Sequence, residues 1–217
     1  MKPVLYGAPL SPFVRKVRLL LDFKGVDYDS KMIIPYATPE GYEALNPLKR
    51  VPALILGDNV LADSAVIAHF LDAHYPEKKL IPNDLLLKAR CEWLEKYADY
   101  ELSAHTTFTV FSQRILNRIA GKKPNEEIVQ KAIHEKLPPL FDYLESQLNG
   151  LHFIADELTL ADISVASQLI SYEHANETVP DDKWPKLAQL YQHFKQQTIV
   201  EQVVSSEKVM LKKILGA

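Results

Sequence analysis

The sequence predicts two domains, a small α/β domain built on a mixed sheet and then an all-helical domain. Residues 1–78 alternate short apolar strands with helical patterns, and residues 83–217 show helical periodicity without a strand signal. The intervening segment carries Pro76 and Pro82 and has the composition of a linker. With 217 residues, 47% of them hydrophobic and 24% charged, the chain is long enough to form two hydrophobic cores.

The first domain is predicted to contain four strands and two main helices. The strands are expected at Val4–Tyr6, Tyr28–Ile34, Ala53–Leu56 and Val60–Ala62, and the helices at Pro12–Lys24 and Ser64–His74, with at most a short helix at Tyr42–Leu45. Because a strand-helix-strand unit gives parallel pairing and a hairpin gives antiparallel pairing, the sheet is expected to be mixed.

The second domain is predicted to be helical throughout. Helices are expected at Leu85–Ala120, Glu126–Leu148, Leu160–Tyr172, Trp184–Gln197 and Val200–Leu215. Thr159 and Asp162 resemble a capping box in which aspartate replaces the usual glutamate or glutamine. This cap is expected to start a buried helix.

Composition argues against several classes of function. The net charge of −3 and the lack of a long basic or acidic block give no sign of a nucleic-acid partner. No apolar stretch approaches the roughly 20 residues of a membrane span, and no signal peptide is evident, so a cytoplasmic protein without a membrane partner is expected. A single cysteine, Cys91, leaves no CxxC motif and no cysteine-rich metal site.

Val51 and Pro52 stand at the start of a predicted buried strand and are the most informative pair in the chain. Proline cannot donate to a strand ladder, so it is confined to strand starts, edges and bulges. An X-Pro bond adopts the cis form readily, and a cis turn here would direct the amide and carbonyl of Val51 into a cleft. Exposed backbone of this kind can pair with a peptide-like ligand.

Asp63 and Ser64 directly precede the apolar-periodic run of a predicted helix. The free backbone amides and the dipole of a helix N-terminus attract a carboxylate. Together with the Val51 backbone, this pair predicts a small-molecule site for a ligand that carries both an amine and a carboxylate.

Ser11 precedes Pro12 at the start of the first predicted helix. Serine followed by proline is a common N-cap, and for Ser11 taken alone that interpretation is favoured. In the predicted topology this turn lies beside the Val51-Pro52 turn, where a hydroxyl can donate a hydrogen bond to an anion. No GxSxG motif or recognisable histidine partner accompanies Ser11, so its predicted role is donor and not nucleophile.

Four motifs, in order along the chain, resemble the cytosolic glutathione S-transferase family, in particular its serine-type classes similar to theta and zeta. They are Ser11-Pro12-Phe13, NPLKRVPAL from Asn46 to Leu54, Asp63-Ser64 leading into SAVIAHFL, and TLADIS from Thr159 to Ser164. The resemblance spans nearly the whole chain. It implies a thioredoxin-like first domain, an all-helical second domain, glutathione as co-substrate without a metal, and a hydrophobic electrophile as second substrate.

The resemblance also implies roles for individual residues. Ser11 would be the catalytic residue that stabilises the glutathione thiolate. The backbone of Val51 would pair with the cysteinyl unit, next to the cis-proline Pro52. Ser64 would hold the γ-glutamyl carboxylate, and Asp63 would face the γ-glutamyl amine.

Further contacts are implied at the two ends of the ligand. Arg50 matches a position that often contacts the glycine end, Lys49 is a weaker candidate, and Phe13 belongs to the same glutathione-binding set. The electrophile pocket is expected to include Leu10 and three residues of the long helix at i, i+3 and i+6, His105, Phe108 and Phe111. Aromatic residues at that spacing are usually core, so the two interpretations stand about even.

Two sets of residues near Ser11 have simpler explanations. Tyr6 lies near the position at which tyrosine-type transferases keep their catalytic phenol, but the surrounding residues do not match those classes, so we interpret it as packing. Arg15, Lys16 and Arg18 are interpreted as the solvated side of the first helix.

The sequence departs from the family pattern at three places. Asp63 is one methylene shorter than the commoner glutamate, and Ala155 stands where a glycine usually precedes the capping box. Pro12 and Phe13 follow Ser11, whereas zeta enzymes usually carry a second serine and a cysteine there. The third difference ranks a glutathione-dependent isomerase or dehalogenase below a conjugating transferase.

Another alternative is a non-catalytic transferase-like module that binds a protein partner. The retention of Ser11, Val51 and Ser64 argues against this reading. The resemblance also implies a homodimer.

Overall fold

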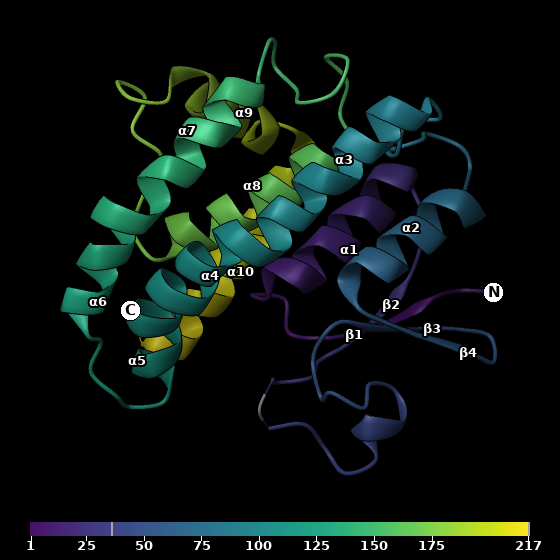
Figure 1. The fold of residues 1–217 in the computed structure, drawn as a ribbon. Helices are drawn as coiled ribbons and strands as arrows, with labels where there is room; N and C mark the ends of the chain where they lie inside the picture. The colour runs from purple at the N-terminus through teal and green to yellow at the C-terminus, as the bar shows by residue number, and fades with distance from the viewer. Residues whose placement is uncertain (36, 217) are drawn as a thin grey trace. The chain divides into compact units, whose positions relative to one another are not determined.

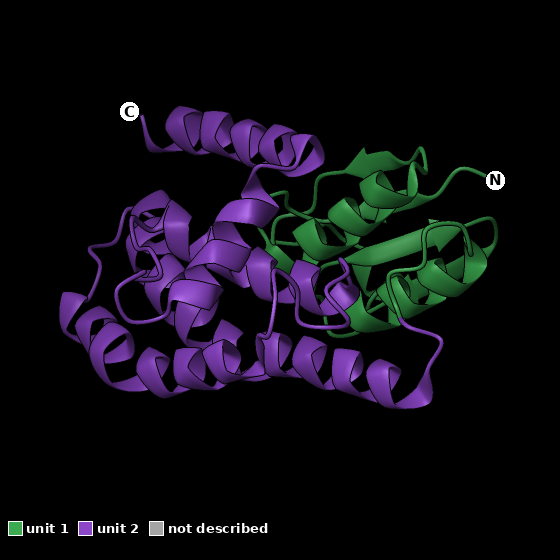
Figure 2. Cartoon of the chain, turned by 90° about the horizontal axis from the view of Figure 1, so that it is seen from above, with its two compact units in different colours: residues 1–81 green, residues 82–217 purple. Residues whose placement is uncertain are grey.

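The first part of the chain folds into a four-stranded sheet with two main helices (Figure 1). The computed structural model describes residues 1–35 and 37–216. Two compact units divide the chain, unit 1 at residues 1–81 and unit 2 at residues 82–217 (Figure 2). The elements of unit 1 are β1 (Val4–Tyr6), α1 (Pro12–Lys24), β2 (Asp29–Lys31), the 3₁₀ helix η1 (Tyr42–Ala44), β3 (Ala53–Leu56), β4 (Asn59–Ala62) and α2 (Ser64–His74).

The sheet has the strand order β2-β1-β3-β4. β1 and β2 are parallel, as expected for strands joined through a helix, and β3 is antiparallel to both β1 and β4. Tyr6 pairs with Lys31 on one side and with Ala53 on the other, and Ala53 pairs with Ala62. The predicted mixed four-stranded sheet is confirmed.

β2 is shorter than the sequence suggested. The predicted strand Tyr28–Ile34 is wrong in length, because the ladder runs only from Asp29 to Lys31. β2 is an edge strand, all three of its residues are exposed, and its one neighbour β1 is itself three residues long. A strand can pair no further than its neighbour extends, so the apolar residues beyond Lys31 leave the sheet.

The two faces of the sheet are covered differently. Figure 1 shows α1 and α2 on one face, where side chains such as Leu5, Leu20 and Ile67 are fully buried. On the other side a small cluster of Ile33, Tyr42 and Ala53 packs with Tyr6, Leu45 and Val51. The interpretation of Tyr6 as a packing residue is confirmed.

Helix α1 begins and ends where the sequence predicts. Pro12 occupies its first turn, and Gly25 adopts the left-handed conformation after its last residue, with φ 67°. The prediction that Arg15 and Lys16 are solvated is wrong, since they are 0% and 1% exposed. Such side chains can be buried when the apolar stem packs and the charged head finds a partner, and the Arg15 guanidinium donates to the Leu10 carbonyl at 3.4 Å.

A buried ion pair joins α1 to α2. Nζ of Lys24 lies 2.7 Å from Oδ1 of Asp72, and the two side chains are 0% and 3% exposed. Lys24 also donates to the carbonyls of Tyr75, Lys78 and Glu77 at 2.8, 3.2 and 3.4 Å. Asp72 accepts from the amides of Leu80 and Ile81 at 2.9 and 3.3 Å, so one pair fixes the whole segment that ends unit 1.

Unit 2 is built from helices, as the sequence predicts. They are α3 (Leu85–Tyr97), η2 (Ala98–Leu102), α4 (Ser103–His105), η3 (Thr106–Leu116), α5 (Asn117–Ile119), α6 (Glu126–Lys131), η4 (Ala132–Lys136), α7 (Leu137–Gln147), α8 (Leu160–His174), α9 (Pro185–Lys195) and α10 (Thr198–Leu215). Residues 85–119 and 126–147 are each helical without a break. The predicted all-helical second part of the fold is confirmed.

The long helix of residues 85–119 is not a regular α-helix. Its segments η2 and η3, and η4 further on, are π-helical, with hydrogen bonds to the fifth residue back. The hydroxyl of Thr109 also reaches five residues back, to the carbonyl of Ala104 at 2.8 Å. Because a π-helix turns less per residue than an α-helix, residues three apart in η3 do not share one face.

Helix α8 forms the buried centre of unit 2 and starts at the predicted capping box. The Asp162 carboxylate accepts from the amide and hydroxyl of Thr159, each at 2.8 Å, and from the amide of Phe153 at 3.1 Å. The prediction that Asp162 has a structural role is therefore confirmed. Just before this cap Ala155 has φ 51°, a left-handed conformation that costs an L-residue roughly 1–2 kcal/mol. The glycine that the resemblance leads us to expect at this position would adopt the same conformation without that cost.

Candidate functional site

The predicted glutathione-binding residues of unit 1 gather at one edge of the sheet. Tyr6, Ala53 and Ala62 form a row across β1, β3 and β4. β1 ends at this row and leads into the turn to Ser11, β3 begins there after Val51 and Pro52, and β4 ends there before Asp63. The strand order therefore brings three separate segments together, although they lie up to about 50 residues apart in the chain.

Ser11 occupies the N-cap position of α1. Its backbone amide donates to the Ala8 carbonyl at 3.0 Å, and its own carbonyl accepts the first helical bond, from Arg15 at 2.8 Å. Within residues 1–35 and 37–216, the side chain makes no capping hydrogen bond. The local explanation for a serine here is a side-chain cap, so an uncommitted hydroxyl favours a role toward a ligand.

Gly7 allows the turn before Ser11 to lie close to α1. A Cβ at this position would overlap the side chain of Val14, so any larger residue would push β1 away from the helix. The turn that carries Ser11 is therefore held directly against its own helix.

The Val51-Pro52 peptide bond is cis. Among the described residues, no hydrogen bond uses the amide or the carbonyl of Val51. Its side chain packs against the small cluster that contains Tyr42, and this packing holds the residue in place. Two adjacent backbone groups at a strand start are thus free to pair with an extended peptide.

Asp63 is the N-cap of α2, and its Oδ1 accepts from the amides of Ala65 and Val66 at 2.9 and 3.2 Å. Its backbone has φ 76° and ψ 131°, which is strained for a residue other than glycine and costs on the order of 1–3 kcal/mol. Strain of this kind persists where the surrounding structure imposes it, often at ligand sites. Ser64 follows as the first helical residue and is only 4% exposed.

The remaining predicted residues of unit 1 divide into exposed and buried groups. Lys49 and Arg50 are exposed, and Nζ of Lys49 lies 3.9 Å from the Glu43 carboxylate, so both cations are accessible to an anion. Leu10 is 8% exposed and Phe13 is half-buried, which makes Leu10 a core residue of unit 1.

The three predicted pocket residues of unit 2 differ in burial. Phe111 is 2% exposed and belongs to the core, Phe108 is 55% exposed, and His105 is intermediate. The predicted spacing of i, i+3 and i+6 assumed a regular α-helix, whereas Phe108 and Phe111 lie in the π-helical segment η3. Burial lowers the pKa of His105, and the nearby Lys136 lowers it further. Phe108 and His105 are the two accessible candidates.

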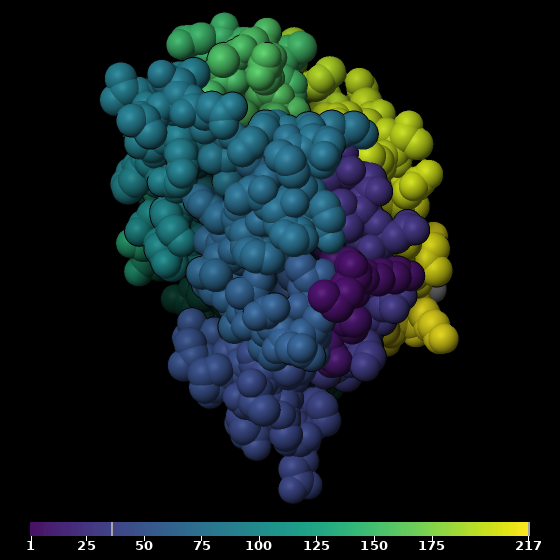
Figure 3. Space-filling view, turned by 90° about the vertical axis from the view of Figure 1, so that its right-hand side faces the viewer, coloured from purple at the N-terminus to yellow at the C-terminus, as the bar shows by residue number. Residues whose placement is uncertain are grey.

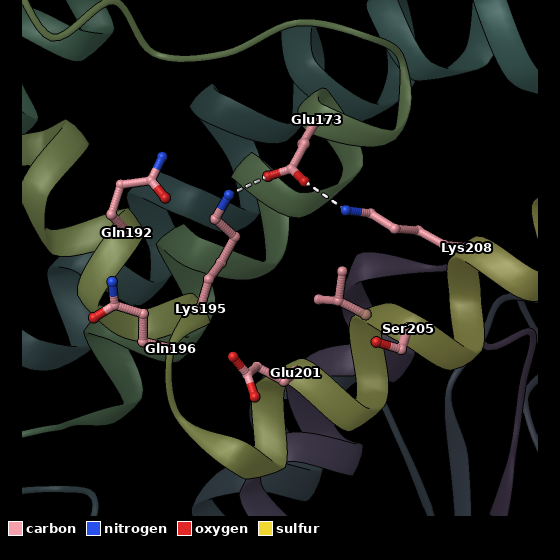
Figure 4. A pocket seen from close by; sticks show the side chains of 8 residues that line it. Glu173, Gln192, Lys195, Gln196, Glu201, Ser205 and Lys208 are labelled. Atoms are coloured by element: carbon pink, nitrogen blue, oxygen red, sulfur yellow. Dashed lines mark hydrogen bonds and ion pairs between the residues drawn. The ribbon is translucent and has the colours of Figure 1, made fainter.

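A pocket of about 330 Å³ lies elsewhere in unit 2, between α8, α9 and α10 (Figure 4). Glu173 accepts from Lys195, Tyr191 and Lys208 at 2.6, 2.7 and 3.0 Å. Burial raises the pKa of Glu173, but these hydrogen bonds outweigh it and lower the pKa to about 2. The carboxylate therefore stays ionised and links α8, α9 and α10. The pocket is electrically neutral, because the two carboxylates of Glu173 and Glu201 balance the two ammonium groups of Lys195 and Lys208. We interpret this pocket as structural.

Among the described residues we find neither a second reactive side chain nor a metal-binding cluster. Cys91 is a buried thiol whose pKa burial raises to about 12, against hydrogen bonds from Ala161 and Thr159 that lower it. No group of three or more His, Cys, Asp or Glu side chains in residues 1–35 and 37–216 is arranged to hold a metal ion. In the same residues no helix has both the length and the apolar character that crossing a membrane requires.

Sequence reasoning missed two residues behind the sheet edge. Tyr42 and Asn46 both donate to the carbonyl of Arg50, the residue before Val51. The Asn46-Pro47 dipeptide was the available signal, since it marks a turn, but a turn signal does not name the partner of the side chain.

Comparison with known proteins assigns the family. The family described as glutathione S-transferase, N-terminal domain, matches residues 5–79, and the corresponding C-terminal domain matches residues 111–207. A glutathione S-transferase of Triticum aestivum is 33% identical over 174 residues, which is 77% of each chain. The maleylacetoacetate isomerase of Rattus norvegicus is 28% identical over 180 residues, 79% of each chain.

A solved structure agrees with this match. A glutathione transferase homologue from Drosophila mojavensis, with bound glutathione, superposes with a TM-score of 0.77 at 28% identity, covering 96% of this chain and 97% of its own. The chain belongs to the glutathione S-transferase family, a family of transferase enzymes.

Proposed function

We propose that this protein is a glutathione transferase that binds reduced glutathione along the sheet edge and directs its sulfur at a hydrophobic electrophile. The observation that carries the proposal is the sheet edge, which brings together the Ser11 hydroxyl, the Val51 backbone and the helix N-terminus at Ser64. Within residues 1–35 and 37–216, neither the Ser11 hydroxyl nor the Val51 backbone has a hydrogen-bond partner. Extended backbone pairs with a peptide, and a helix N-terminus binds its carboxylate. A tripeptide with an amine, a carboxylate and a thiol fits all three.

In the proposed reaction the Ser11 hydroxyl donates a hydrogen bond to the glutathione sulfur. A free thiol has a pKa near 8.5, and a hydrogen bond to its charged form together with a helix N-terminus lowers the pKa by about one unit or more. The thiol proton passes to solvent. The thiolate then forms the new carbon–sulfur bond, and the leaving group of the electrophile, chloride in the case of chloronitrobenzene, departs from that carbon with its bonding electron pair. The protein adds placement, because holding two reactants together replaces a bimolecular encounter.

Contacts to the ends of the ligand follow from the same edge. Ser64 holds the γ-glutamyl carboxylate, and Asp63 faces the amine with the carboxylate oxygen that the α2 amides leave open. Arg50 and Lys49, both exposed, are the cations available to the glycine carboxylate. His105 and Phe108 supply part of the electrophile site.

A glutathione-dependent isomerase is the second candidate, favoured by the similarity to the rat maleylacetoacetate isomerase. It uses the same thiolate with a different acceptor. Pro12 and Phe13 after Ser11 depart from the zeta pattern, which ranks conjugation first.

Titration calorimetry with reduced glutathione tests the proposal. We expect saturable binding of one glutathione per chain, and much weaker binding of an analogue whose γ-glutamyl carboxylate is an amide, because that analogue cannot use the charge preference of the α2 N-terminus. S-methylglutathione is the matched control, since it keeps both ends of the ligand and lacks only the acidic proton. Absence of binding by the folded protein would support the non-catalytic module instead.

We also propose that the protein is a homodimer in the cytoplasm, where reduced thiols are maintained. Leu86, Trp93 and Tyr100 recur every seven residues along one helix and are 82%, 54% and 64% exposed. An apolar stripe of this kind on a surface indicates a protein interface. Gel filtration is expected to give about twice the 24.7 kDa of one chain, and elution at the monomer mass would contradict the proposal.

A further inference from the structure

A tight turn over residues 46–50 precedes Val51, and Asn46 organises it. Its side-chain oxygen accepts from the amide of Leu48 at 3.0 Å, and its backbone carbonyl accepts from the amide of Lys49 at 2.9 Å. Its side-chain nitrogen donates to the carbonyl of Arg50 at 2.9 Å. Both polar atoms of one buried side chain thus shape the turn, which also needs the left-handed φ of 53° at Lys49.

Tyr42 donates to the same carbonyl from η1. Its hydroxyl lies 2.9 Å from the Arg50 oxygen, and the residue is 3% exposed within the cluster that also holds Ile33 and Ala53. Burial raises the pKa of Tyr42, which keeps the phenol protonated and therefore a donor. A carbonyl oxygen has two lone pairs, and here two buried donors are available to fill them.

Fixing the Arg50 carbonyl also fixes the amide of Val51. The two groups belong to one planar trans peptide unit, in which the C=O and the N–H point in opposite directions. Since Tyr42 and Asn46 hold the carbonyl on the buried side, the Val51 amide points away from them.

The outer part of the turn lies at the surface. Residues 47–50 are all exposed, and in Figure 3 the stretch around them, in indigo, projects as a lobe at the bottom of the molecule. A loop that is mobile before binding must be ordered by the ligand, and that ordering reduces affinity. The two donors to Arg50, together with the packing of the Val51 side chain on the cluster, therefore keep this backbone in one orientation without the ligand.

We infer that Asn46 and Tyr42 are positioning residues for glutathione, which hold the Arg50-Val51 peptide so that Val51 presents its amide and carbonyl to the cysteinyl unit. The inference rests on the proposed function, since it names what preorganises the same site. Neither side chain touches the ligand in this role. They act through the peptide group that does.

The test compares Asn46→Asp and Tyr42→Phe with the wild-type protein. Asn46→Asp keeps the acceptor for Leu48 but replaces the donor to Arg50 with a carboxylate oxygen and adds a charge at a buried site. Tyr42→Phe is the cleaner change, because it keeps the packing ring and removes only the hydroxyl. Each is expected to weaken glutathione binding in calorimetry by about tenfold, the usual worth of one such hydrogen bond. The KM for glutathione should rise by a similar factor, while kcat at saturating glutathione stays within about twofold, because the bound geometry is unchanged.

Tyr28→Phe is the matched control. It also removes a half-buried phenol of unit 1, one that is hydrogen-bonded to Asp22 and Arg18 and lies outside the turn. Its glutathione affinity should equal that of the wild-type protein even if its melting temperature falls. If Asn46→Asp does not fold, Tyr42→Phe alone decides the test.

The outcomes distinguish the positioning role of Asn46 and Tyr42 from the proposed function itself. If the wild-type protein binds glutathione and the Asn46 and Tyr42 variants bind it equally well, the positioning role is overturned and the proposed function stands. If the wild-type protein binds no glutathione, both are overturned. A loss that appears in kcat and not in KM would also contradict positioning, because it would place the effect in the transition state.

Discussion

Replacing Ser11 with alanine is expected to lower the kcat of glutathione conjugation by about 10²-fold, the usual effect of removing one donor to a developing or stabilised anion. Without this hydrogen bond the pKa of the bound thiol rises toward its free value. Each unit by which the pKa rises above neutral pH lowers the thiolate fraction by about nine tenths. The measurement is steady-state turnover with chloronitrobenzene, together with a pH titration of the thiolate absorbance of bound glutathione. The variant should regain activity as the pH rises, since the thiolate then forms without help.

The free energy of unfolding distinguishes a catalytic role of Ser11 from a helix-capping role. A serine whose side chain caps a helix loses about 0.5–2 kcal/mol when it becomes alanine. The Ser11 side chain makes no capping bond in the described structure, so Ser11→Ala should unfold in urea within a few tenths of a kcal/mol of the wild-type protein. Ser11→Thr, which keeps a hydroxyl, should retain more activity, and Ser30→Ala on the exposed strand β2 should change neither property. A Ser11→Ala variant that conjugates at the wild-type rate would refute the catalytic assignment.

The parts of this fold that the sequence predicted well are those that depend on neighbouring residues. Pro12 and Gly25 delimit α1, Asp63 caps α2, and the capping box of Thr159 and Asp162 starts α8, each through contacts within a few residues. The gathering of the site at one sheet edge followed in turn from strand order, because parallel and antiparallel connections restrict which segments can meet.

The unpredicted features all depend on partners far along the chain or on small energy differences. Lys24 and Asp72 look like ordinary helix-surface charges, and only the packed structure shows that they are buried together. The π-helical hydrogen bonding of η3 was also not predicted, because hydrophobic periodicity indicates a helix over Leu85–Ala120 without distinguishing α from π hydrogen bonding. The role of Tyr42 passes through a backbone carbonyl, which leaves no mark on side-chain patterns.

Replacing Lys24 with methionine is expected to destabilise the protein by about 3–5 kcal/mol, because it leaves the Asp72 carboxylate buried without its counter-ion. Asp72→Asn should have a comparable effect, since it leaves the ammonium group uncompensated. Urea unfolding followed by circular dichroism measures both. The control is Lys88→Met, which breaks an exposed pair with Glu92 at 3.8 Å and should cost less than about 1 kcal/mol.

Replacing both Lys24 and Asp72 distinguishes the contribution of their charges to stability from that of their hydrogen bonds to the backbone. In many proteins an apolar pair of similar size substitutes for a buried ion pair at little cost, because the desolvation penalty disappears with the charges. Here Lys24 and Asp72 also satisfy the backbone of residues 75–81, with three carbonyls and two amides as partners. Lys24→Met combined with Asp72→Leu should therefore stay well below wild-type stability, because buried backbone groups would lose their partners. Recovery of full stability in the double variant would show that these backbone bonds contribute little and that the single-variant losses came from the unpaired charge alone.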